Sequence, residues 1–391
     1  MKKALILFLA TIAFIACNTQ TSQFTLEGTI EKGNINRLYL FEVINEQYYY
    51  IKLIDSISVT NNKFSYVNDS LQTQLYFLSI HANNQLPKTF EDGTYLFLRK
   101  TKNSISVSHE PGTPIQASVK NSSIEDQFTA FTKEFNEVGN QKVLDSLDQL
   151  FFAARDCNDT IEMQRIKEYS APYYDDAMQR TDEWLKKQIE DNKAKGSLFG
   201  LYLYYTYHFQ NINLTTLDEI NAARTSLNNY DDEAKQSAYF SKIKNQLTQM
   251  EQSAIGHEAP EITGLDAKDN EMKLSDFRGK YVIVDFWSSS CSWCRLETPN
   301  LAKTYNQFKD KNFTILGVSS DFKKDDWLKA IEEDGSHWDH IMLRKEDINK
   351  IMNHYSIIGI PEILLIDPQG VILAKGLRGE SIYNTVAEHI K

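Results

Sequence analysis

Hydrophobic and polar positions follow three different patterns along the chain. Between residues 24 and 119, short apolar runs alternate with turn residues such as Gly33-Asn34 and Asn61-Asn62. Short runs punctuated in this way are typical of the strands of an antiparallel β-sandwich. We predict strands in this region at residues 63–67, 74–80, 94–98 and 104–107.

The middle region, residues 120–255, contains few glycines and one proline, Pro172. Apolar side chains recur there at helical spacing, for example Leu144, Leu147 and Phe151, which predicts a helical region. The tyrosine-rich stretch 198–209 has two interpretations, a ligand-stacking surface or a buried helix. We favour the buried helix, because apolar aromatic stripes usually belong to a core.

Strands and helices alternate from residue 256 to residue 391. The run 281–287 begins with Tyr-Val-Ile-Val, which is typical of a strand buried on both faces of a central parallel sheet. The further predicted elements are helices at 292–309, 325–333, 345–354 and 381–390, and strands at 313–318, 363–366 and 371–375. The pattern predicts an α/β domain.

The first residues have the layout of a secretory signal. Lys2 and Lys3 precede an apolar run that ends at Ala16 and is shorter than the roughly 20 residues of a membrane-spanning helix. Phe14-Ile15-Ala16-Cys17 resembles a bacterial lipoprotein signal, in which the cysteine becomes the acylated N-terminus. The alternative is a plain signal peptide with a chance cysteine.

The resemblance implies a signal peptide at 1–16, lipidation of Cys17 and a tether at 17–23. An acylated cysteine anchors a protein to a membrane surface without spanning it. No acidic run follows Cys17. We therefore expect a periplasmic or cell-envelope location, lipid-anchored to a membrane and not on the cell exterior.

The composition narrows the classes of partner. Of the 391 residues, 41% are hydrophobic and 12% aromatic, and the net charge is −11. These values are ordinary for globular domains with sizeable cores. A negative chain without a Lys/Arg cluster repels phosphate backbones, so we expect no nucleic-acid partner.

The four cysteines are too few for a disulfide scaffold. Cys157 is either a resolving thiol or an unpaired residue. We favour the second reading, because its acidic neighbours Asp156 and Asp159 disfavour a thiolate. The pair Cys291 and Cys294 is close enough in sequence to suggest chemistry.

The segment VDFWSSSCSWCRLETP, residues 284–299, places this pair after a buried strand and at the start of a helix. Free backbone N–H groups and the positive end of the helix dipole stabilise a thiolate there. We expect Cys291 at the exposed tip and Cys294 one turn inward, where it can close a disulfide. Arg295 adds positive charge nearby.

This region resembles a thioredoxin-fold domain of the TlpA/ResA-like envelope thiol-disulfide oxidoreductases, within the AhpC/TSA-redoxin superfamily. The matching features are Asp285-Phe286-Trp287, Glu297, Pro299, the segment GIPEILLIDPQG at 359–370 and the lead-in 259–280. The resemblance implies a thioredoxin fold over 256–391 and a cis-proline at Pro361 that faces the CxxC. Residues 24–119 resemble a small β domain of unknown function that precedes such domains in Gram-negative lipoproteins.

The family mechanism implies that Cys291 attacks a partner disulfide and that Cys294 resolves the mixed disulfide. Asp285 and Glu297 are the candidate bases for Cys294. The residues expected to contact substrate are Trp287, Ser292, Trp293, Ile360 and Pro361. The implied partners are disulfide-bearing envelope proteins and a membrane thiol protein that donates electrons, with no cofactor and no metal.

Three other functions fit parts of the sequence. A zinc site would need two more ligands, and His337 and His340, the nearest short pair, are expected on a loop surface. A thiol peroxidase is suggested by Ser288-x-x-Cys291, which loosely resembles the peroxiredoxin motif. A non-enzymatic binding lipoprotein is the third possibility, because residues 24–255 lie outside the redox domain.

Overall fold

The computed structural model describes residues 23–45, 50–81, 93–111 and 113–390. The chain forms two compact units, residues 1–125 and 126–391. The signal peptide and Cys17 lie outside the described residues, so both stay predictions. Within the described ranges, no helix has the length and apolar character needed to span a membrane.

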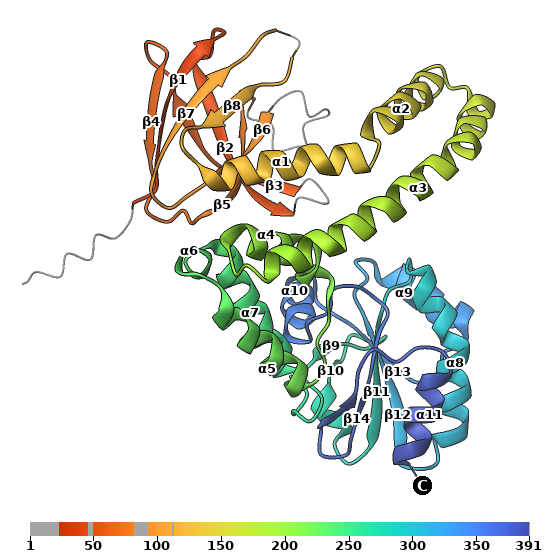
Figure 1. The fold of residues 1–391 in the computed structure, drawn as a ribbon. Coiled ribbons are helices and arrows are strands. Elements are labelled where there is room, and N and C mark those ends of the chain that lie inside the picture. Colours follow the sequence, from red (N-terminus) through yellow and green to blue (C-terminus); the bar gives the residue numbers. More distant parts are fainter. Residues whose placement is uncertain (1–22, 46–49, 82–92, 112, 391) are drawn as a thin grey trace, which may run out of the picture. The chain divides into compact units, whose positions relative to one another are not determined.

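Two four-stranded sheets enclose the core of the first unit (Figure 1). Inward-facing Leu26, Leu40 and Ile105 are fully or almost fully buried, which is the alternation expected of a sandwich. The sheet orders are β4-β1-β7-β8 and β3-β2-β5-β6. The strands are β1 Thr25–Lys32, β2 Arg37–Asn45, β3 Tyr50–Ser58, β4 Lys63–Val67, β5 Gln74–Ser79, β6 Gly93–Leu98, β7 Lys102–Ser108 and β8 Gln116–Val119.

The predicted β-sandwich is confirmed with one correction. Strands β1 and β7 pair in parallel, with Gly28 opposite Ile105, so the first sheet is mixed and not purely antiparallel. These strands are far apart in sequence, and no local pattern reveals the direction in which they pair.

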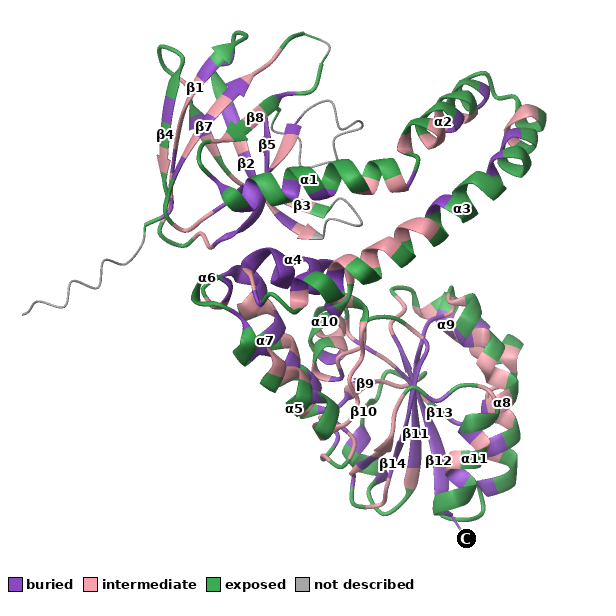
Figure 2. Cartoon of the chain, in the orientation of Figure 1, coloured by how far each residue is buried: buried purple, intermediate pink, exposed green. Residues whose placement is uncertain are grey.

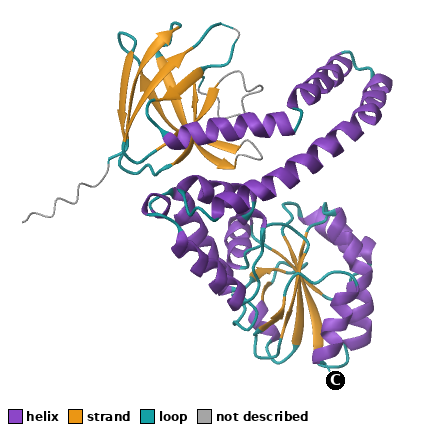
Figure 3. Ribbon diagram, viewed as in Figure 1, coloured by secondary structure: helices purple, strands orange, loops and turns teal. Residues whose placement is uncertain are grey.

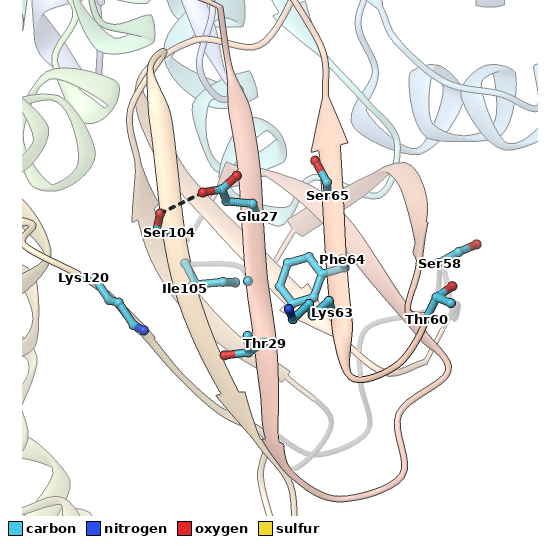
Figure 4. A pocket seen from close by; sticks show the side chains of 11 residues that line it. Glu27, Thr29, Ser58, Thr60, Lys63, Phe64, Ser65, Ser104, Ile105 and Lys120 are labelled. Carbon is cyan, nitrogen blue, oxygen red and sulfur yellow. Dashed lines mark hydrogen bonds between the residues drawn. The ribbon is translucent and has the colours of Figure 1, made fainter.

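A shallow cavity of about 690 Å³ lies over β1, β4 and β7 (Figure 4). Its main carboxylate, Glu27, is already engaged, because it pairs with Lys102 and accepts a hydrogen bond from Ser104. Gly28 forms part of the lining, and a Cβ there would lie 2.3 Å from the Ile105 carbonyl oxygen. The cavity is therefore a feature of strand packing with its main charge satisfied internally.

The middle of the chain is helical, as predicted (Figure 3). The tyrosine-rich stretch forms α4, which is almost entirely buried (Figure 2), and Tyr202 packs against Phe128 and Tyr239. Cys157 follows α2 as an exposed free cysteine. The helices are α1 Ser123–Val138, α2 Gln141–Asp156, α3 Thr160–Lys193, α4 Leu198–Tyr207, α5 Leu217–Ser226, α6 Asp232–Lys235 and α7 Ala238–Gln252.

The C-terminal domain is a seven-stranded sheet with helices on both faces. Its order is β10-β9-β13-β12-β11-β14-β15, and the central strand β11 is parallel to β12 and antiparallel to β14. The strands are β9 Thr263–Leu265, β10 Glu271–Lys273, β11 Tyr281–Trp287, β12 Phe313–Ser319, β13 Asp339–Met342, β14 Glu362–Ile366 and β15 Ile372–Ala374. The helices are α8 Ser292–Phe308, α9 Lys324–Asp334, α10 Lys345–His354 and α11 Glu380–His389.

The two faces of this sheet have separate cores. On one face, Ile283 of β11 packs in a cluster with Leu301 of α8 and Ile382 of α11. On the other, Val284 packs in a cluster with Ile351 of α10. Alternate residues of β11 therefore enter different cores, which explains the uninterrupted apolar run in this strand.

The helical region joins this domain through its last residues. The Gly256 N–H donates to the Ile372 carbonyl at 2.8 Å, and the Ala259 N–H donates to the Gly370 carbonyl at 2.8 Å. Residues 256–259 thus run beside the start of β15, at one edge of the sheet. Lys375 adds a hydrogen bond to the Ser253 hydroxyl, just after α7.

Gly200→Ala tests how tightly α4 packs on the end of α3. Alanine normally favours a helix over glycine by about 1 kcal/mol. Here its Cβ would lie 2.2 Å from the Asn192 carbonyl oxygen, so we expect a net loss of about 1–3 kcal/mol in unfolding free energy. Urea denaturation followed by circular dichroism measures it.

Gly359→Ala is the matched control, because a Cβ there meets nothing within 4 Å and its stability should change little. Equal stability of Gly200→Ala and the unmodified protein would contradict the packing described here.

Candidate active site

The two cysteines lie at the junction of β11 and α8. Cys291 is the N-cap residue of α8, and its Sγ accepts a hydrogen bond from the Cys294 backbone N–H at 3.1 Å. The two sulfurs form a disulfide, with the Cα atoms 5.3 Å apart. Cys291 is partly exposed, whereas Cys294 is 4% exposed. The more accessible sulfur is therefore the one that the helix N-terminus stabilises as a thiolate.

Arg295 does not supply free positive charge to this site, contrary to the expectation from sequence. Its guanidinium donates to the Asp334 carboxylate at 2.6 Å and to Glu333 at 2.9 Å. These carboxylates compensate its charge, and the ion pairs fix α8 to α9. In the reduced state, a thiolate at Cys291 would be stabilised by the backbone N–H groups of α8 and not by Arg295.

Asp321 anchors the loop that leads into the cysteine pair. Its carboxylate accepts hydrogen bonds from the Ser289 backbone N–H at 2.9 Å and from the Ser289 and Ser319 hydroxyls at 2.6 and 2.7 Å. Sequence reasoning missed this residue. The sequence did contain a signal, because Ser319 ends β12 and Ser320-Asp321 follow it, beside the carboxyl end of the parallel strand β11.

The Ile360–Pro361 peptide bond is cis, as the resemblance implies. The Ile360 carbonyl oxygen lies 3.7 Å from the Cys291 Sγ, so the turn before β14 lies directly beside the reactive sulfur. Arg378 donates to the Pro361 carbonyl. The segment after β15 thus holds the proline turn against the cysteines.

Asp285 is a buried carboxyl group below the cysteine pair. It is 7% exposed, and its burial raises the pKa to about 7, while Arg378 lowers that pKa and Glu297 raises it. Asp285 shares a face of β11 with Trp287, and Trp287 belongs to the same buried cluster as Cys294. A carboxyl group in this state can take up or release a proton near neutral pH.

Glu297, the second candidate base, is held by other groups. Its Oε2 accepts hydrogen bonds from the Gly379 backbone N–H and the Asn300 side chain, both at 2.9 Å. Gly379 has φ 53° and ψ −130°, a conformation suited to glycine. Glu297 therefore fastens α8 to the segment before α11.

The residues predicted to contact substrate occupy different depths. Ser292 and Trp293 are exposed, with Trp293 at 75%, and Ile360 is partly buried. Pro361 is buried. Trp287 is only 5% exposed and lies in the buried cluster of Cys294, so its substrate contact stays a prediction. Sequence reasoning missed Leu296 and Ile358, which are exposed apolar residues close in sequence to the cysteines and the cis-proline.

The two histidines of the zinc alternative lie in different environments. His337 is exposed in a loop, as expected, but His340 lies in β13 with its ring nitrogens buried. The loop-surface expectation for His340 is therefore wrong. In the described part of the chain, no three His, Cys, Asp or Glu side chains are grouped so that they could hold a metal ion.

Comparisons with known proteins agree with this geometry. The model of the AhpC/TSA family matches residues 255–375. A ResA thiol-disulfide oxidoreductase of Geobacillus kaustophilus is 30% identical over 128 residues, which are 33% of this chain and 72% of that protein. The chain belongs to the ResA-like thiol-disulfide oxidoreductases. It is therefore an oxidoreductase, and Cys291 and Cys294 form a disulfide in the part of the chain that matches the family.

Two further relatives of this ResA-like protein are similar over the same share of the chain. A ResA of Bacillus thuringiensis is 28% identical over 163 residues, covering 39% of this chain and 86% of that protein. The crystal structure of the thioredoxin domain of a Bacteroides vulgatus thiol-disulfide oxidoreductase is 56% identical, covering 35% of this chain and 99% of that one, with a TM-score of 0.35.

Asp285→Asn should stabilise this ResA-like protein at alkaline pH. The folded pKa of Asp285, about 7, exceeds the unfolded value of about 4. The folded state therefore binds the proton more tightly, and stability falls as the pH rises through this window. The variant removes this cost, which is at most about 4 kcal/mol.

Urea denaturation at pH 8 and pH 4.5, followed by tryptophan fluorescence, measures the difference. We expect a clear gain in unfolding free energy at pH 8 that shrinks at pH 4.5. Asp310→Asn, at an exposed position, is the control and should show no such pH dependence. A gain of the same size at both pH values would refute the proposed ionisation.

Proposed function

We propose that this oxidoreductase reduces disulfides of proteins in the cell envelope, with Cys291 as the nucleophile and Cys294 as the resolving cysteine. The observation that carries the assignment is the asymmetry of the pair. The Cys291 sulfur is the more accessible one and accepts the helix N–H, whereas Cys294 is buried.

The proposed reaction moves two electrons from the cysteine pair to the partner. The Cys291 thiolate attacks one sulfur of the partner disulfide, and the other partner sulfur leaves as a thiolate. The Cys294 thiolate then attacks the Cys291 Sγ, which releases the second partner sulfur and leaves the Cys291–Cys294 disulfide. A thiol protein of the membrane returns the enzyme to the dithiol by the same exchange in reverse.

Asp285 is the proposed base for Cys294. Its pKa of about 7 lets a substantial fraction be ionised at neutral pH and still accept a proton. Glu297 has a supporting role, because its carboxylate already binds Gly379 and Asn300.

The partner is proposed to lie along the turn before β14. The backbone of Ile360 runs beside the Cys291 sulfur, where an extended segment can pair with the chain. Ser292 and the exposed Trp293 flank the sulfur on the helix side. Pro361 shapes the turn from its buried position.

Cysteine variants separate the two proposed roles. Cys291→Ala should lose reduction of insulin disulfides by at least about 100-fold, because no nucleophile remains. Cys294→Ala should retain attack and accumulate a mixed disulfide with the substrate, detectable by non-reducing electrophoresis and mass spectrometry. Accumulation with Cys291→Ala instead would reverse the assignment.

The reduction potential of the pair, equilibrated with glutathione, decides the direction. A value near about −250 mV or lower supports a reductase, and a value near about −120 mV indicates an oxidant or isomerase. If no Cys291–Cys294 disulfide formed at any potential, the proposed mechanism would be wrong.

We further propose that Cys17 is acylated and anchors the protein to an envelope membrane. The support is the signal-like sequence that precedes it. In Gram-negative cells fed radiolabelled palmitate, the full chain should incorporate label and Cys17→Ser should not. Cys157→Ser should be labelled normally, and label retained in Cys17→Ser would exclude the anchor.

A further inference from the structure

His340 is a partly buried histidine with both ring nitrogens shielded from solvent, and the mechanism above does not use it. It pairs with Gly317 of β12, and Gly317 pairs with Asp285 of β11. The three residues form one row across the sheet, on the face opposite to that of Ile341 and Val284. The side chains of Asp285 and His340 therefore enter the same core, separated by a residue without a side chain.

The His340 ring fills the space that Gly317 leaves open. A Cβ on Gly317 would lie 2.2 Å from the His340 Nδ1. Neighbouring strands are about 4.8 Å apart, so a ring that lies above Gly317 of β12 is halfway between β13 and β11. The absence of a side chain at Gly317 thus lets Nδ1 lie closer to Asp285.

The surroundings of the ring are aromatic. Trp287 and Trp338 contact it with ring centroids 5.7 and 5.6 Å away, and the Trp338 ring is stacked on it. Both ring nitrogens are buried, and within the described residues neither meets the distance and angle of a hydrogen bond, although the Ser336 backbone lies close enough to raise the pKa of the ring. A buried polar atom without a partner is rare and commonly marks a functional requirement.

We propose that His340 and Asp285 share one proton as a buried pair behind Cys294, and that His340 is in this way a positioning residue for the resolving step. This inference rests on the proposed function. The Cys294 thiol gives its proton to the Asp285 carboxylate, and the carboxyl group shares that proton with Nδ1 of the neutral imidazole. The Cys294 thiolate attacks Cys291, and the departing partner thiolate takes up a proton from solvent.

The electrostatics of the core agree with this sharing. Burial lowers the pKa of His340 to about 4, with a small opposing effect of the Ser336 backbone, so the ring is a neutral acceptor at pH 7. Arg378 and Glu297 face Asp285. Helices α8 and α9 cover this core. Near the cysteines, they add the partly buried ion pair between Arg295 and Asp334. Asp339 precedes His340 on β13 and is therefore directed away from this core.

His340→Phe keeps an aromatic ring between the two tryptophans and removes both nitrogens. The reduced full chain is mixed with oxidised glutathione, and tryptophan fluorescence is followed between pH 5 and 9. Attack by Cys291 depends on the glutathione concentration, whereas resolution by Cys294 does not, so the two rates separate. We expect resolution to slow at least tenfold at pH 7 with a shifted pH midpoint, and attack to change less than twofold.

Asp285→Asn and the double variant complete a cycle. If the two residues share one proton, the double variant resolves no more slowly than Asp285→Asn alone. His337→Phe, at an exposed loop position, is the control and should behave as the unmodified protein. The inference would be overturned if the two substitutions slowed resolution independently, so that the fold-changes multiplied in the double variant. An unchanged pH midpoint of resolution in His340→Phe would also overturn it.

Two further measurements cover the cases in which His340→Phe does not fold or the proposed function itself fails. If His340→Phe does not fold, ¹⁵N spectra of the unmodified protein and Asp285→Asn must differ at the His340 Nδ1, and identical spectra would refute the pairing. Failure of the unmodified protein to form or resolve a mixed disulfide would instead refute the proposed function.

Discussion

The hydrogen bond from the Cys294 N–H to the Cys291 sulfur joins the fold to the chemistry. It exists because α8 begins at the residue after Cys291, directly beyond the buried strand β11. The surrounding contacts preserve this geometry from several directions. Asp321 holds the loop before the cysteines, and Arg378 holds the cis-proline turn beside them. Backbone groups of Cys294 and Ile360 therefore surround the Cys291 sulfur, and the side chains of Asp321 and Arg378 hold those backbone segments in place.

Three carboxylates near the site differ because their surroundings differ. For Asp285, burial outweighs the opposing effect of Arg378 and raises the pKa to about 7. Asp321 accepts several hydrogen bonds and acts as an anchor for the loop. Glu297 binds a backbone N–H and an amide, which makes it a fastener between two segments. Residue type alone does not distinguish these roles.

Local patterns predicted the parts of the fold that are locally determined. The strand Tyr281–Trp287 and the helix start at Ser292 follow from an apolar run and the residues that cap the helix. The parallel β1–β7 pair, the Arg295–Asp334 ion pair and the short strand β13 join segments that are distant in sequence. The depth of Trp287 could not be read from the sequence for the same reason, since it depends on α9 and β13 packing over the ring.

The pairing of residues 256–259 with the sheet edge has a consequence for association between copies of the protein. An uncovered sheet edge offers unpaired N–H and carbonyl groups to any other extended chain, which promotes aggregation. Here residues 256–259 bond to Gly370 and Ile372, at and just before the start of β15. At the opposite edge, β10 is three residues long and includes Glu271, which pairs with Arg344. The covered stretch beside β15 and the short, charged strand β10 both disfavour intermolecular strand pairing.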